Sequence, residues 1–209
     1  MKKDTKRGNA LISALKSDEI VELSKEYIEL GIGSLIESDV FESIPFVGTA
    51  IGLYKAAGSV RDQLFIEKVI RFLTHFSDLP DAERINMTER LNEDDKFAGK
   101  AGAKLIEIID RMESEDKPEV AAEFLKAFGR KEIDFNVLRR LLVALERVPS
   151  FDIRKLAVFA AIDPDQPMKM EDDFLDSLVN AGMAKSNGAW KSIIVPTELC
   201  RTFVRAGKL

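Results

Sequence analysis

The chain has 209 residues, of which 45% are hydrophobic and 32% are charged, and its formal net charge is −5. That length suits one large or two small domains, and the negative net charge argues against a surface that attracts nucleic acid as a whole. Cys200 is the single cysteine. The composition therefore excludes an internal disulfide and a cysteine-based zinc site, and it fits a reducing cytoplasm.

The first elements expected along the chain are helices. Residues 9–37 follow a helical pattern with a break, Asp18 is a predicted N-cap, and Gly31 weakens the end of the pattern. A long helix is expected next, from Pro45 near its start to about Phe76. At about 30 residues it would measure roughly 45 Å, and we predict that it is the central element of an all-α domain.

Small residues form a ridge in the first half of this long helix. Gly48, Gly52 and Ala56 are spaced four residues apart in segment 43–60, where Lys55 is the only charged residue. Residues at this spacing share one helix face, so another backbone can pack closely against them. One interpretation is a buried core helix, and the other is a membrane-contact segment. The uncharged stretch is too short to span a bilayer, which favours the core.

A polar pair, Arg61 and Asp62, lies directly beside the ridge. The sequence leaves open whether these residues join a buried ion pair or a functional one. A second cluster of small residues lies in the helix expected over residues 95–112, and we predict that it packs against the ridge. Glycine inside a helix costs about 1 kcal/mol and needs a compensating contact. The cluster comprises Ala98, Gly99, Ala101, Gly102 and Ala103.

Pro149 and Ser150 mark the predicted boundary between an all-α helical domain, residues 1–149, and a C-terminal domain, residues 150–209. The remaining helices of the first domain include a hairpin that Gly129 is expected to close as a left-handed cap. These helices are predicted over residues 81–92, 116–129 and 135–148, the second of them capped by Asp116.

The C-terminal domain resembles the winged-helix superfamily in the order of its expected elements. The resemblance implies DNA binding, with the second helix in the major groove. That helix is acidic, and no arginine or lysine lies between Glu171 and Ala184, which argues against DNA as the partner. The expected elements are helices over 151–161 and 170–181, strands over 183–185 and 190–195 that form a two-stranded wing, and a terminal helix from Pro196.

Basic residues gather on the predicted wing and on the last helix instead. Because these residues lie outside the acidic second helix, we expect them to form a contact surface for a protein rather than for DNA. The partner is either another protein or a second copy of the chain. The predicted surface comprises Lys185, Lys191, Arg201 and Arg205.

No set of residues predicts catalysis. His75 is the single histidine and has no nucleophile in a suitable context, so a structural role is expected. The acidic clusters lie near helix starts, where carboxylates favour the helix dipole. The loop around residues 126–137 imitates an EF-hand but lacks the oxygen ligands that calcium needs. We therefore expect no catalytic residue, no cofactor and no metal.

Two runs, IPFVGTAIGLYKAAGSVRDQLFIEKVIRFL and KLIEIIDRMESEDKPEVAAEFLKAFGRKEIDF, resemble a group of uncharacterised bacterial helical proteins. The first run carries an Ile-Pro opening followed by Val-Gly, Arg-Asp and Phe-Leu pairs, and the second contains a hairpin that begins with Lys-Pro. The resemblance spans about residues 40–160. It implies a bacterial or phage origin and a helical cytosolic protein, with phage defence as an association, and it implies no activity.

The sequence therefore predicts a non-catalytic cytoplasmic interaction or regulatory protein that acts through protein contacts. Two alternatives stay open. The first is a membrane-perturbing effector, of toxin or phage-defence type, that uses segment 43–60 and lies at the periphery of the inner membrane, where basic N-terminal residues would meet anionic lipid. The second is a winged-helix DNA-binding regulator.

Overall fold

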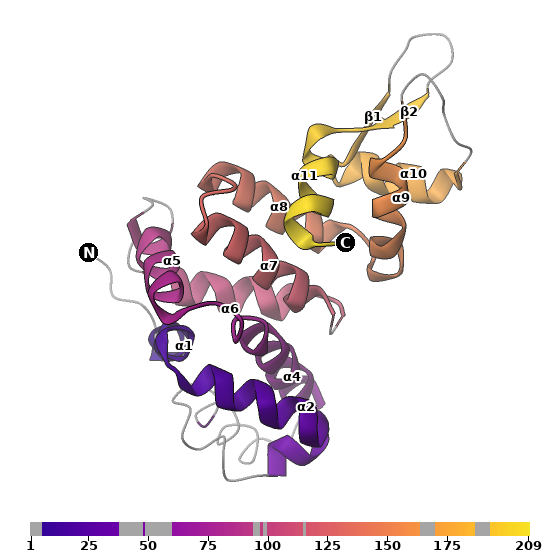
Figure 1. Cartoon of the computed structure of the whole chain (residues 1–209). Coiled ribbons are helices and arrows are strands. Elements are labelled where there is room, and N and C mark those ends of the chain that lie inside the picture. The colour runs from indigo at the N-terminus through magenta and orange to yellow at the C-terminus, as the bar shows by residue number, and fades with distance from the viewer. Residues whose placement is uncertain are drawn as a thin grey trace.

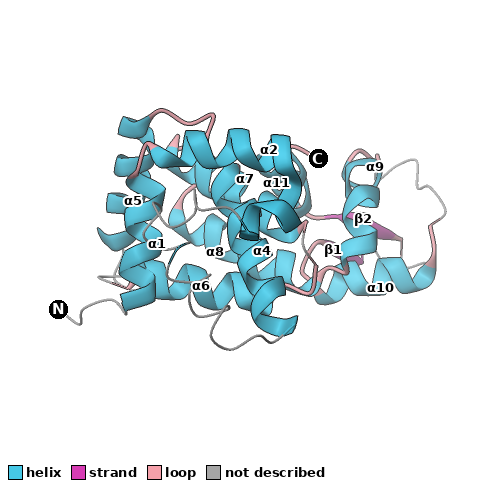
Figure 2. Ribbon diagram, turned by 90° about the horizontal axis from the view of Figure 1, so that it is seen from below, coloured by secondary structure: helices cyan, strands magenta, loops and turns pink. Residues whose placement is uncertain are grey.

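The structure is a computed structural model that describes residues 6–37, 48, 60–93, 97, 100–114, 116–163, 170–186 and 193–209, without the side chains of residues 32–37 and 62. These residues are mostly helical, with one small antiparallel sheet (Figure 1). The predicted mostly α fold class is confirmed at this level. The sheet and α10 lie at the end of the molecule opposite α1 and α5 (Figure 2).

The helices and strands follow one another as α1 Lys6–Lys16, α2 Glu19–Glu37, α4 Val60–Thr74, α5 Asp81–Glu93, α6 Ala101–Arg111, α7 Lys117–Gly129, α8 Phe135–Arg147, the 3₁₀ helix η2 Ser150–Lys155, α9 Leu156–Ala160, α10 Asp172–Asn180, β1 Ala184–Ser186, β2 Ile194–Pro196 and α11 Glu198–Gly207.

The predicted break in the first helical segment lies at Ser17 and Asp18, between α1 and α2. A second break follows at Gly31, whose φ of 67° requires the left-handed backbone that glycine tolerates. Of the long helix predicted to end near Phe76, the structure shows α4. The small-residue ridge lies outside the described residues, except for Gly48, which is half-buried.

Two glycines bring α1 and α6 into backbone contact. A Cβ atom built on Gly102 would lie only 2.0 Å from the carbonyl oxygen of Gly8. The glycine in α6 thus has the compensating contact that its helical position needs. Its described partner is α1, and the predicted packing of this cluster against the ridge stays a prediction, because most of the ridge lies outside the described residues. The helix itself begins at Ala101, later than the predicted start.

Among the described helices, α7 occupies the centre of the packing. It contacts α4, α5, α8 and α11, and all of its residues from Lys117 to Phe128 are buried except Glu119. Its partner α8 buries an apolar stripe that includes Leu138, Leu141 and Leu145, and it turns its polar face outward. The central position predicted for the 45–76 helix therefore belongs, within the described part of the chain, to α7.

The two predicted caps of α7 differ from expectation. Gly129 is the last residue of α7, and the left-handed conformation falls on Lys131, whose φ is 63°. Gly129 packs closely against Met87 of α5, because a Cβ atom on the glycine would lie 3.1 Å from the Cβ atom of that side chain. Asp116 occupies the predicted N-cap position of α7, but its side chain makes no capping hydrogen bond, and its carboxylate lies 3.4 Å from Nη1 of Arg71.

The C-terminal elements follow the predicted order. Gly182, with a φ of 74°, ends α10, and the amide of Met183 donates to the carbonyl of Leu178 at 2.8 Å, as in a Schellman cap. Strands β1 and β2 pair with Lys185 opposite Val195. The residues predicted to form the turn between them lie outside the described part of the chain.

The last helix joins the C-terminal elements to the rest of the core. Phe203 of α11 packs edge-to-face on Phe124 of α7, with ring centroids 4.9 Å apart. A Cβ atom on Gly207 would lie 3.2 Å from Val120, also in α7. Buried side chains from both sides of the predicted 149/150 boundary therefore belong to one hydrophobic cluster, and the division into two domains stays a prediction.

Replacement of Gly102 by alanine is expected to destabilise the fold by about 2 kcal/mol or more, because α1 must move away from α6 to admit a methyl group. Gly129→Ala is the matched control, because its Cβ would lie 3.1 Å from the Cβ atom of Met87, a contact that a shift of a few tenths of an ångström relieves, and because helix propensity improves. Urea unfolding measures both changes. Equal stability of the two variants would contradict the backbone contact.

Candidate functional site

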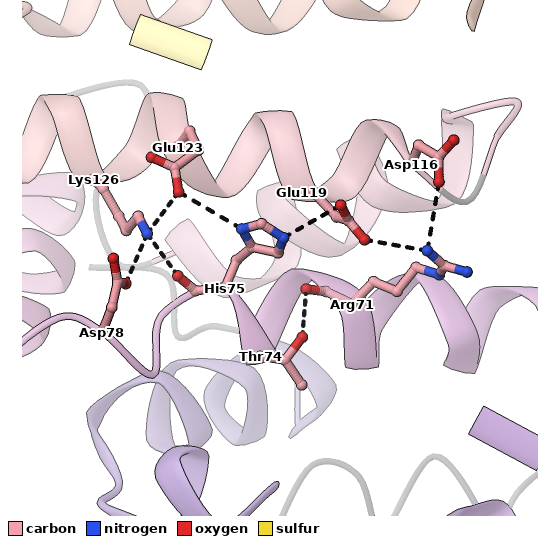
Figure 3. A network of polar contacts seen from close by, with 8 residues as sticks. All are labelled: Arg71, Thr74, His75, Asp78, Asp116, Glu119, Glu123 and Lys126. Carbon is pink, nitrogen blue, oxygen red and sulfur yellow. Dashed lines mark hydrogen bonds and ion pairs between the residues drawn. The ribbon is translucent and has the colours of Figure 1, made fainter. Parts of the chain in front are cut away.

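A polar network lies between α7 and the turn that follows α4 (Figure 3). We define it by Arg71, His75, Asp78, Asp116, Glu119, Glu123 and Lys126. The two glutamates are one helical turn apart on α7, so both carboxylates face the same side. His75 lies between them, with Nε2 3.3 Å from Glu119 Oε2 and Nδ1 3.6 Å from Glu123 Oε1.

Lys126 is the most deeply buried member of the polar network, with a side chain only 2% exposed. Its ammonium group donates to the carbonyl oxygen of His75 at 2.8 Å and to Asp78 at 2.7 Å, and it lies 2.6 Å from Glu123. A lysine ammonium group carries three donors, and these contacts satisfy all of them. The turn after α4 is thereby fixed to α7.

Further ion pairs extend the polar network at both ends. Arg71 of α4 lies 3.2 Å from Glu119 and 3.8 Å from Glu67. At the other end, Lys208, which follows α11, lies 2.7 Å from Glu123. The network therefore connects α4, α7 and the C-terminal residues, three parts of the chain that are far apart in sequence.

The charges in this network shift the pKa values of its members. Hydrogen bonds to Glu119 first and Glu123 second raise the pKa of His75 to about 9. Burial by itself would raise the pKa of Glu123, but hydrogen bonds from His75, Lys126 and Lys208 outweigh it and lower the value to about 2. At neutral pH His75 is therefore a cation whose two ring nitrogens both carry protons, and it has no lone pair with which to act as a base.

A second candidate site is a groove along the outer face of α8. The arginine groove, as we name it, encloses about 600 Å³, and its described lining residues are Asn136, Val137, Arg139, Arg140, Val143, Arg147, Ala181 and Leu199. None of these residues is acidic. The guanidinium group of Arg147 donates to the carbonyl oxygen of Asn180 at 3.4 Å. Val143, at the middle of the row, is 45% exposed.

Arg61, the described residue of the polar pair beside the ridge, is exposed. The guanidinium group of Arg61 lies 3.2 Å from the carboxylate of Asp110 in α6, and the arginine side chain is 83% exposed, so this residue takes part in no buried ion pair there. The side chain of Asp62 lies outside the described residues. An exposed pair of this kind contributes little to stability.

The predicted basic surface is described in part. Lys185 is exposed in β1, and Arg201 and Arg205 lie one turn apart on α11. Arg205 is exposed and donates to Thr202 Oγ1 at 3.3 Å. Lys191 lies outside the described residues. Whether these residues act together as one contact surface stays a prediction.

Sequence reasoning missed the arginine groove. Its signal was present, because Asn136, Arg140, Val143 and Arg147 follow one another at helical spacing on the polar side of an amphipathic helix. What the sequence did not show is that Leu199 of α11 and Ala181 after α10 border this face and make it concave.

Within the described ranges, no helix is long and apolar enough to cross a membrane. The same part of the chain holds no cluster of three or more histidine, cysteine, aspartate or glutamate side chains arranged to bind a metal ion. Cys200 is buried in the core, and burial raises the pKa of its thiol to about 12. A thiol in this state is a poor nucleophile.

The raised pKa of His75 predicts a pH-dependent contribution to stability. The folded state holds the proton more tightly than the unfolded state, whose value is near 6.5, so the contribution is complete below pH 6.5 and is lost as the pH rises through 9. Urea unfolding of the natural chain and of His75→Gln should show a difference that shrinks between pH 6 and pH 10. A constant difference would contradict the ion pairs.

Glu123→Gln is expected to cost about 3 kcal/mol at neutral pH, because it leaves the buried Lys126 with one carboxylate fewer. Asp116→Asn is the control within the same polar network. The carboxylate of Asp116 is 74% exposed, so its loss should cost at most about 1 kcal/mol. Unfolding in guanidinium chloride measures both variants. Equal stability of the two would contradict a stabilising contact between Glu123 and the buried Lys126.

Comparison with protein-family models, with curated proteins and with solved structures finds no match to the chain. The resemblance to an uncharacterised bacterial group and the winged-helix order are therefore predictions from the sequence, and the function has to be argued from the residues themselves.

Proposed function

We propose that this chain is a non-catalytic protein of the cytoplasm that acts by binding other proteins. The observation that carries the proposal is the arginine groove. Arg139 and Arg140 have no carboxylate partner among the described residues, and an exposed valine, Val143, lies between them and Arg147. Arginine beside apolar side chains is typical of protein interfaces, where guanidinium groups serve as anchors.

The polar network supports a structural role for the charged residues between α4 and α7. His75 is protonated at neutral pH, and Lys126 and Glu123 are engaged with several partners each. Groups held in this way stabilise the packing of α4 against α7. They leave no nucleophile next to a base, which is the arrangement that covalent catalysis requires.

A winged-helix-like arrangement of the C-terminal residues is part of the proposal. Its support is the order of α9, α10, the β1–β2 pair and α11. The first turn of α10 carries Asp172 and Asp173, both exposed, and Asp176 follows one turn later. These carboxylates would repel a phosphate backbone, so a protein is the better partner for this part of the chain.

The test is a pull-down with the full chain as bait, together with size-exclusion chromatography and light scattering to detect self-association. We expect the natural chain to retain a protein, either a second copy or another polypeptide, that Arg139→Glu/Arg140→Glu loses. Arg154→Glu is the control, because Arg154 is an exposed arginine outside the groove lining. A natural chain that is strictly monomeric and retains nothing that the double variant loses would contradict the proposal.

A further inference from the structure

The arginine groove is built on a well-anchored helix. The side chain of Asp134 caps α8 by accepting from the amide of Val137 at 2.8 Å. Leu138, Leu141 and Leu145 on the opposite face are fully buried. The outward face therefore has a fixed backbone, and a partner that binds there does not have to order it first.

Two arginines of the arginine groove form no ion pair within the described chain, although Arg139 also lines a neighbouring hollow with Glu107 and Glu146. Elsewhere in the fold, Arg84 lies 2.6 Å from Asp81 and Arg71 lies 3.2 Å from Glu119. Arg139 and Arg140 have no such carboxylate among the described residues, although the chain has 36 acidic residues against 31 lysines and arginines. Unpaired guanidinium groups in one groove attract an anionic partner, and they hold carboxylates in a bidentate manner.

The apolar part of the lining distinguishes between anionic partners. Val137, Val143 and Leu199 lie among the arginines, and Val143 leaves 45% of its surface exposed. A phosphodiester backbone offers no aliphatic group to cover that surface. A polypeptide that combines carboxylates with an aliphatic or aromatic side chain matches both kinds of lining.

The acidic residues of α10 also favour a polypeptide over a nucleic acid as the partner. Ala181, at the end of α10, forms one border of the groove, and Asp176 lies on the same helix. A long polyanion that continued along α10 would approach this carboxylate and those of Asp172 and Asp173. A short acidic segment ends before it reaches them.

We propose that the arginine groove binds an acidic segment of a partner protein, with carboxylates on Arg139, Arg140 and Arg147 and an apolar side chain over Val143. This inference rests on the proposed function and names the chemistry of the partner. The carbonyl oxygen of Asn180 holds Arg147 at one end of the row, so the segment lies along α8 between that residue and Asn136.

The experiment uses two pools of synthetic 12-residue peptides, mixed in equal amounts and passed over the immobilised full chain. In the acidic pool every position is randomised among Glu, Asp, Leu and Phe. In the amide pool Gln and Asn take the places of Glu and Asp. Mass spectrometry of the retained peptides gives the ratio of acidic to amide peptides. We expect a ratio of ten or more at low salt, falling as the salt concentration rises.

Three variants, each first shown to be folded by circular dichroism, test where the peptides bind. Arg139→Gln/Arg140→Gln should bring the ratio close to one. Val143→Ser should reduce the retained Leu and Phe while the preference for acidic residues persists. Arg154→Gln should change neither the ratio of acidic to amide peptides nor the amount of retained Leu and Phe. No preference for acidic peptides, or a preference that survives the double substitution, would overturn the proposal.

A 12-nucleotide single-stranded DNA serves as the competing anion. If it displaces the acidic peptides at equal concentration, the groove recognises phosphate and the proposed segment is wrong. The proposed function is judged separately by the pull-down. A protein that the natural chain retains through the groove, in the absence of any acidic-peptide preference, would overturn this inference and leave the proposed function standing.

Discussion

The fold depends on the pairing of charged side chains that α7 buries against its neighbours. Lys126 is 2% exposed and Glu123 is 10% exposed, and isolated charges at such depth cost several kcal/mol each. The polar network provides this pairing by bringing together α4, the turn after it, and the residue that follows α11. Apolar contacts such as Phe124 on Phe203 then complete the packing around the ions.

The position of α7 also determines which surface remains for a partner. Because α8 lies against α7 through its leucines, its arginines point outward, and α11, which packs on α7 as well, supplies Leu199 as a border of the groove. The buried network and the exposed groove are thus two results of one packing arrangement. The charged groups of the polar network pair with one another, whereas those of the arginine groove are available to bind another molecule.

The sequence predicted the helical class, most helix positions and the two short strands, because periodicity and turn residues act locally. The predictions from the sequence failed where the structure depends on contacts between residues far apart in the chain. Gly129 packs against Met87 rather than forming a left-handed cap, and Gly102 contacts Gly8, more than 90 positions away. His75 was expected to be structural from its context, but its two glutamate partners on α7 were not foreseen. The arginine groove was missed because its concavity comes from α11.

The most direct test of this account is an NMR titration of the imidazole group of His75, which is the only histidine in the chain and therefore gives an unambiguous signal. If the polar network holds α4 to α7 as described, the ring should remain protonated at neutral pH and titrate with a midpoint near 9. A midpoint near 6.5, the value of a free histidine, would show that the two glutamates do not hold the ring, and it would contradict the central packing arrangement.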